Sequence, residues 1–191
     1  MDTEAKGLSA IRNGSDRIYF GYQGSMMSTN VQIQAWSLDY EKIAELELEI
    51  EDNFVTEMVL CHNEQFLVCT HNNGLVTVIR TEDMSLVSTS APFEETHGTI
   101  ENFSNLKRIN PEFVNIFEKL IFASTQGLFV AMITAEGEIQ TADEAYFKGC
   151  NVTNCEIIQG DLVICTLNDE EGTSKIMTVN VETEEVDLVQ E

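Results

Sequence analysis

Basic residues are scarce in this chain, and their scarcity excludes one group of partners. The 191 residues include 10 lysines and arginines against 33 aspartates and glutamates, which gives a formal net charge of −23. Such a charge repels nucleic acids and anionic membrane surfaces at long range and attracts basic partners. We therefore predict protein partners, with no nucleic acid and no membrane among them. High acidity also favours solubility, whatever the partners are.

Long apolar runs, prolines and paired cysteines are also lacking. No stretch approaches the roughly 18 apolar residues that span a bilayer, and residues 1–6 lack the apolar core of a secretory signal. Two prolines and no low-complexity tract argue against extensive disorder. Five cysteines are an odd number, unlike a disulfide framework, so we expect reduced thiols in a cytoplasmic or nuclear protein.

Sequence patterns of catalysis and cofactor binding are absent as well. The side chains that normally titrate near neutral pH are the three histidines His62, His71 and His97, and none lies in a hydrolase motif. Glycine patterns that cradle phosphate groups are missing. We predict no catalytic residues and no cofactor.

One cluster of cysteine and histidine resembles a metal site in composition. Cys61, His62, Cys69 and His71 together have the residue types of a zinc site. Consecutive residues in a strand point to opposite faces, so Cys61 and His62 diverge and at most three of the four converge. We therefore predict no metal site here, and buried thiols instead.

Short apolar segments rich in Val, Ile, Phe and Thr recur along the whole chain between Gly, Asn and Asp, which is typical of strands and turns. Four pairs of segments are the strongest: 17–22 with 31–36, 66–70 with 75–79, 120–124 with 128–133, and 162–166 with 175–181. A further strand precedes each pair (8–12, 55–60, 99–109, 152–158), and a weaker one follows (43–50, 85–90, 138–141, 185–189). Residues 110–117, between the predicted strands 99–109 and 120–124, form either a short helical turn or an irregular loop. The pattern predicts an all-β protein.

The strand pairs recur along the sequence at similar intervals. Phe20, Val68, Phe122 and Ile164 mark the second strands, about 42 to 54 residues apart, and four-stranded units of this length are typical of β-propeller blades. The middle strands are apolar at consecutive positions, which favours burial on both faces between stacked blades. We predict four antiparallel four-stranded blades with approximate boundaries 1–52, 53–94, 95–147 and 148–191.

The third strands carry a family resemblance. Residues 73–80 have a turn glycine followed by an alternating strand, and 31–37 carry the single tryptophan, Trp36, where WD repeats usually have one. The chain therefore resembles the WD-repeat-like β-propeller superfamily, with degenerate repeats: it has no Trp-Asp pair and no Gly-His pair. Because that family usually closes a ring of seven or eight blades, the resemblance implies part of a larger propeller. A second copy, another polypeptide or a longer chain would supply the remaining blades.

Two groups of residues are candidate partner contacts. Met26 and Met27, in the long loop 23–30, form a predicted apolar patch with Trp36, although we favour Trp36 as blade core. Glu47, Glu49 and Glu51 alternate with apolar residues and form a predicted acidic strip, which is equally interpretable as a solvated outer strand.

The predicted function is a non-catalytic scaffold for protein–protein interaction, or a regulatory propeller segment of a larger assembly. Two alternatives stay open. One is an acidic escort that binds basic proteins, whose binding would weaken with added salt. The other is a propeller enzyme with carboxylates and histidines around a central channel.

Overall fold

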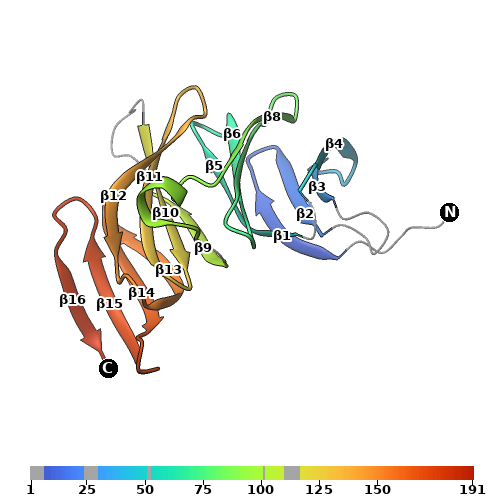
Figure 1. The fold of residues 1–191 in the computed structure, drawn as a ribbon. Coiled ribbons are helices and arrows are strands. Elements are labelled where there is room, and N and C mark those ends of the chain that lie inside the picture. The colour runs from blue at the N-terminus through green and yellow to red at the C-terminus, as the bar shows by residue number, and fades with distance from the viewer. Residues whose placement is uncertain (1–6, 24–29, 51–52, 101, 110–116) are drawn as a thin grey trace. The chain divides into compact units, whose positions relative to one another are not determined.

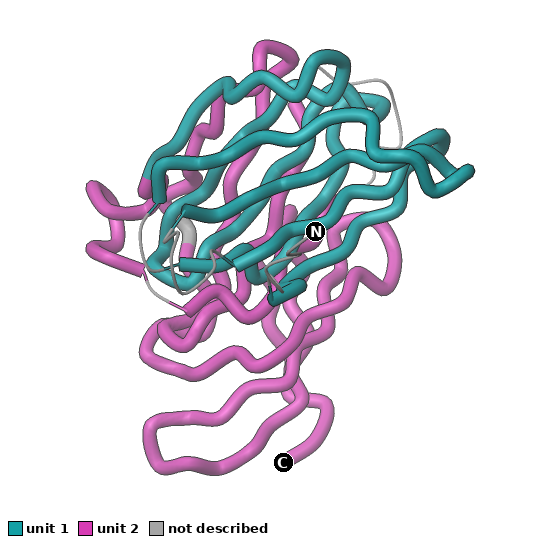
Figure 2. The backbone as a smooth tube through the Cα atoms, turned by 90° about the vertical axis from the view of Figure 1, so that its right-hand side faces the viewer, with its two compact units in different colours: residues 1–90 teal, residues 91–191 magenta. Residues whose placement is uncertain are grey.

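The structure is a computed structural model that describes residues 7–23, 30–50, 53–100, 102–109 and 117–191 (Figure 1). It consists of two compact units, residues 1–90 and 91–191, which Figure 2 shows in different colours. Each unit contains two four-stranded antiparallel sheets, which we call blades 1 to 4 in chain order. The prediction of an all-β chain built from four-stranded repeats is confirmed.

The first unit holds blades 1 and 2. Blade 1 consists of β1 (Leu8–Asn13), β2 (Arg17–Tyr22), β3 (Val31–Ser37) and β4 (Lys42–Leu48). Blade 2 consists of β5 (Val55–Cys61), β6 (Phe66–His71), β7 (Val76–Arg80) and β8 (Ser85–Ser90). In both sheets each strand pairs with its neighbour in the sequence, so hairpins make all the connections (Figure 1).

The second unit holds blades 3 and 4. Blade 3 consists of β9 (Phe103–Arg108), β10 (Phe117–Ser124), β11 (Gly127–Thr134) and β12 (Ile139–Tyr146), and is preceded by the single turn α1 (Glu94–His97). Blade 4 consists of β13 (Asn151–Gln159), β14 (Leu162–Asn168), β15 (Ser174–Asn180) and β16 (Val186–Gln190). No helix in the described part of the chain is long and apolar enough to cross a membrane.

The same tight turn recurs once in each blade. Four residues reverse the chain, and the amide of the fourth donates to the carbonyl of the first, as in the turns that begin at Ser37, His71, Thr134 and Asp169. The fourth residue has positive φ, which glycine adopts without steric cost, and three of the turns place a glycine there. In blade 1 the position is held by Tyr40, at φ 64°.

Each unit has its own apolar core, formed where its two blades pack together. In the first unit Tyr19, Ile33 and Ala35 of blade 1 belong to one buried cluster with Leu67 and Ile79 of blade 2. In the second unit the cluster is formed by aliphatic and cysteine side chains of blades 3 and 4, among them Ile121, Val130, Val163, Cys165 and Val179. All residues of β6 are buried, as its unbroken apolar sequence predicted.

The helical turn α1 was not predicted. Phe93, directly before it, is buried and stacks at an angle on Phe122 and Phe129, with ring centroids 5.1 and 5.2 Å apart. Packing of this one ring, rather than any helical periodicity, explains the turn. The helical turn or loop predicted over 110–117 lies outside the described residues, apart from Phe117, which begins β10.

Candidate interaction surfaces

Blade 1 has one face packed on blade 2 and one partly exposed face, which we call the outer face of blade 1. Its β1–β2 half is apolar: Phe20 pairs with Ile11, and Tyr22 pairs with Leu8. Cross-strand partners point to the same side of a sheet. Ile11 and Leu8 are 52% and 50% exposed, so this half presents large apolar groups to solvent.

The β3–β4 half of the same face is polar. The register pairs Tyr22 with Gln32 and Gln32 with Glu47. It likewise pairs Phe20 with Gln34 and Gln34 with Glu45, while Trp36 pairs with Lys42. The outer face of blade 1 therefore grades from apolar side chains on β1 and β2 to carboxylates on β4.

Hydrogen bonds connect β3 and β4 within the polar half of the face. The indole Nε1–H of Trp36 donates to Gln34 Oε1 at 3.0 Å, and Gln34 Nε2 donates to Glu45 Oε2 at 3.0 Å. Lys42 Nζ lies 2.9 Å from the same carboxylate oxygen. These contacts fix the orientation of the tryptophan ring relative to the carboxylates of β4.

Blade 4 also has a face that does not belong to the core of its unit. Along β14 the buried residues Val163, Cys165 and Leu167 alternate with Leu162, Ile164 and Thr166, which are less buried. Ile164, Ile176 and Glu156 line a shallow, mainly apolar depression of about 210 Å³ on this face. The described large apolar residues with high exposure lie mostly in blades 1 and 4: Leu8, Ile11, Leu38, Tyr40 and Ile43 in the former, and Ile158, Val186, Leu188 and Val189 in the latter.

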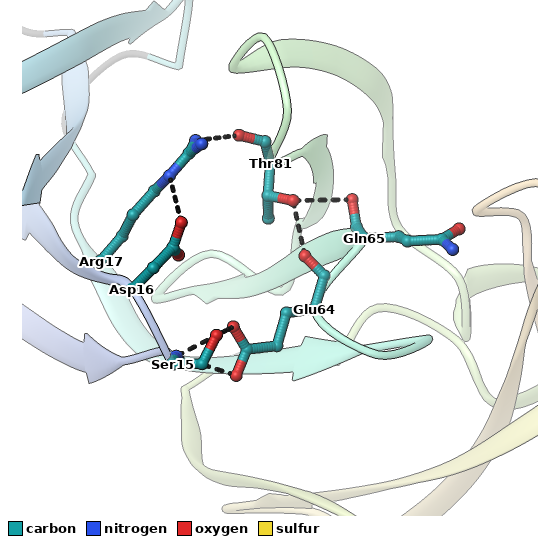
Figure 3. A network of polar contacts seen from close by, with 6 residues as sticks. All are labelled: Ser15, Asp16, Arg17, Glu64, Gln65 and Thr81. Atoms are coloured by element: carbon teal, nitrogen blue, oxygen red, sulfur yellow. Dashed lines mark hydrogen bonds and ion pairs between the residues drawn. The ribbon is translucent and has the colours of Figure 1, made fainter.

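A polar network holds blade 1 against blade 2 (Figure 3). The Glu64 carboxylate accepts hydrogen bonds from the amide and the hydroxyl of Ser15, at 2.8 to 3.0 Å. Arg17 Nη1 donates to the carbonyl of Thr81 at 2.8 Å, and the Thr81 hydroxyl donates to the carbonyls of Glu64 and Gln65. The turn after β1 is thus tied to the two turns that flank β6 and β7.

In the second unit, ion pairs as well as hydrogen bonds connect blade 3 and blade 4. Lys107 Nζ lies 2.6 Å from Glu156 Oε1, and Lys119 Nζ lies 2.8 Å from Asp161 Oδ1 and also contacts Glu182. Burial lowers the pKa of Lys119, but the hydrogen bonds and charges of Asp161 and Glu182 outweigh it, so the pKa lies above its usual value.

The structure places some of the predicted contact residues and not others. Trp36 is half-buried on the outer face of blade 1, away from the core that its blade forms with blade 2. Glu47 is exposed on the same face, and Glu49 is exposed just beyond the end of β4. The other three predicted residues, Met26, Met27 and Glu51, lie outside the described residues.

Phe20 and Tyr22 also lie on this face, although the sequence did not predict them as partner contacts. Phe20 touches both Tyr22 and Trp36, with ring centroids 6.4 and 6.2 Å apart, and its contact with Trp36 is edge-on. The sequence of β2 does place an aromatic or aliphatic residue at every second position. This alternation predicts two faces for the strand, but it does not indicate which face stays exposed to solvent.

The cysteines and histidines in the described part of the chain do not gather into a group of metal ligands. Among the residues with assigned positions, no three His, Cys, Asp or Glu side chains gather as metal ligands. His71 is buried, its Nε2 lies 3.0 Å from the Thr77 hydroxyl, and burial lowers its pKa to about 4. Burial also raises the pKa of the Cys69 and Cys165 thiols to about 12, which leaves them unreactive.

Sheets of consecutive strands, stacked in pairs through apolar faces, define a repeat protein of the propeller class. The comparisons agree. The crystal structure of the RRP9 WD40 repeats matches 96% of this chain with a TM-score of 0.67 and 12% identity, and the structure of U3-55K matches 96% with a TM-score of 0.63 and 11% identity. In both cases the chain spans about half (51%) of the matched structure.

A third similar structure has nearly the same length. The computationally designed Ika4 protein matches 92% of this chain and 93% of its own, with a TM-score of 0.57 and 12% identity. No protein-family model and no curated protein matches the chain. The chain thus shares the β-propeller blade fold of WD40-repeat structures, as its turn glycines and alternating third strands predicted.

Proposed function

We propose that the chain is a non-catalytic interaction scaffold within a larger assembly. It would be a propeller segment whose remaining blades lie in another polypeptide or in a longer form of this chain. The observation that carries the proposal is the outer face of blade 1, where Ile11 and Leu8 stay half exposed beside aromatic rings. Contiguous apolar surface of this kind on a soluble protein marks an interaction site. Trp36, Glu47 and Glu49 are the proposed partner contacts.

Charge favours a different polypeptide over a second copy. Each copy has a net charge of −23, so two copies repel one another more strongly than this chain and a less acidic partner do. The alignment with about half of two WD40-repeat structures supports a propeller larger than these four blades, because those structures continue well beyond the aligned part.

Blade boundaries near 1–52, 53–94, 95–147 and 148–191 belong to the proposal, since each observed sheet lies within one of these ranges. A reducing location, the cytoplasm or the nucleus, also belongs to it. The five free cysteines, of which four are buried, support that location.

The native mass of the isolated chain, measured by light scattering after size exclusion, tests the proposal. We expect a monomer near 21.4 kDa that binds a hydrophobic dye such as anilinonaphthalene sulfonate. Ile11→Ser should reduce dye binding, because it removes exposed apolar surface from the outer face of blade 1. Tyr40→Asn is the matched control: it removes an exposed ring from a turn outside that face, and asparagine tolerates the positive φ there.

Two results would overturn the proposal. A stable homodimer would mean that a second copy completes the propeller. A monomer without dye binding would mean that the open face needs no partner.

A further inference from the structure

The outer face of blade 1 differs in chemistry from the faces that blades use to pack on one another. The two buried clusters between blades consist of apolar side chains, and the charged contacts between blades, such as Lys107 with Glu156, are made by residues outside these clusters. The outer face of blade 1 instead carries Glu45 and Glu47 next to its aromatic rings. An uncharged blade face is therefore a poor occupant for it.

Burial of these carboxylates sets a requirement on the partner. A carboxylate that loses water without gaining a counter-charge is strongly unfavourable. Lys42 already contacts Glu45, while exposed Glu47 accepts a hydrogen bond from the neutral amide of Asn30 at 2.8 Å. The occupant must therefore bring a cation to the Glu47 side of the face.

The aromatic rings specify which cation fits best. Phe20, Tyr22 and Trp36 form a contiguous aromatic cluster, and a cation above a ring is attracted by its electron-rich face. The planar guanidinium stacks on rings and donates to a carboxylate at the same time, whereas the lysine ammonium acts as a compact point charge. Tyr22 and Glu47 lie in one cross-strand row, on the two sides of Gln32, whose own side chain is buried. The ring and the carboxylate therefore flank this amide on the same face of the sheet.

We propose that the outer face of blade 1 recognises an arginine side chain of its partner protein, stacked on the Phe20–Tyr22–Trp36 cluster and paired with Glu47. This proposal rests on the proposed function, because it describes the partner that docks on the same face. It adds the chemistry of recognition: an exposed arginine within an otherwise apolar docking segment.

Trp36 makes the proposal directly measurable, because it is the single tryptophan of the chain. The probes are a short peptide of alternating arginine and serine, the same peptide with lysine, and the same peptide with citrulline, the uncharged analogue of arginine. We expect the arginine peptide to change the Trp36 emission saturably and to bind about two- to fivefold more tightly than the lysine peptide. The citrulline peptide should leave the emission unchanged.

Matched variants separate a local site from the general acidity of the chain. Glu47→Gln should weaken arginine-peptide binding about tenfold, as expected for loss of a charge-assisted pair. Glu82→Gln removes one charge from an exposed glutamate of blade 2 and should leave binding unchanged. Phe20→Leu keeps an apolar side chain but removes the central ring, and should weaken binding too, with circular dichroism confirming that each variant is folded.

The outcomes distinguish this proposal from the one it rests on. Equal binding of the arginine and citrulline peptides, or equal weakening by Glu47→Gln and Glu82→Gln, overturns the arginine site. A dye-binding monomer would still support the scaffold function in that case. A stable homodimer, or a monomer without dye binding, overturns the scaffold proposal even if the peptides bind.

Discussion

The two faces of blade 1 are built from alternate residues of the same four strands, yet they suit different neighbours. Tyr19, Ile33 and Ala35 form a dry contact with blade 2, while Phe20, Gln34 and Trp36 carry rings and amides that lead to carboxylates. Neighbouring residues of a strand point to opposite faces, so one residue belongs to the face buried against blade 2 and the next to the face suited to a charged partner. Stability should therefore depend on the first face, and recognition on the second.

The largest contrast is expected between two isoleucines of this blade. Ile33 is fully buried, so Ile33→Ala should lower the free energy of unfolding by about 2–5 kcal/mol through lost burial and the cavity left behind. Ile11 is 52% exposed on the outer face, and Ile11→Ala should cost less than about 1 kcal/mol. Urea denaturation of both variants measures the difference; equal costs would mean that the two faces are equally packed.

The pH dependence of stability should reveal a polar group buried in blade 2. The pKa of His71 is about 4 in the folded chain and near 6.5 when unfolded, so the unfolded chain binds more protons between these values. The free energy of unfolding contributed by neutral His71 is then full above pH 6.5 and is lost as the pH falls towards 4, by roughly 2–4 kcal/mol.

His71→Gln isolates this contribution from the titration of the many carboxylates. Glutamine does not titrate, and its amide can still bond with the Thr77 hydroxyl that contacts His71. The difference in unfolding free energy between the parent chain and this variant should change between pH 6.5 and 4. A constant difference over that range would contradict burial of a neutral imidazole.

A smaller difference in stability is expected between the polar contacts that connect the blades of the first unit and those of the second unit. Glu64→Gln weakens the charge-assisted hydrogen bonds from Ser15 and should cost about 1 kcal/mol. Glu156→Gln removes the ion pair with Lys107. Because the Glu156 carboxylate is largely exposed, this should cost less than about 0.5 kcal/mol. Thermal denaturation of both variants tests the order, and the reverse order would show that the ion pairs of blades 3 and 4 matter more.

Much of the fold could be predicted from the sequence because its signals are local. Segments 17–22 and 85–90 coincide with β2 and β8, and the turn at 71–74 follows from its asparagines and glycine. The turn α1 escaped prediction because the position of Phe93 among rings of β10 and β11 depends on tertiary packing. A four-residue helix has too little periodicity to be recognised.

The candidate site was only partly predictable. The alternation of Glu45, Glu47 and Glu49 with leucines located an exposed acidic strand, and the structure agrees with that exposure. The position of Trp36 on the outer face, rather than in the core favoured for it, depends on which side of blade 1 meets blade 2. Alternation gives two faces but does not identify the one that stays free, so Phe20 and Tyr22 were not recognised as its companions.

The strictly sequential strand order within each blade has a consequence for synthesis of the chain. Because every strand pairs with its immediate neighbours along the chain, a blade needs no residue made later in order to complete its own sheet. The strand pairing within each blade can therefore form as the blade leaves the ribosome, and its apolar face is buried once the other blade of its unit has been translated. The β-strand edges that would otherwise attract nascent chains nearby are then exposed for a shorter time.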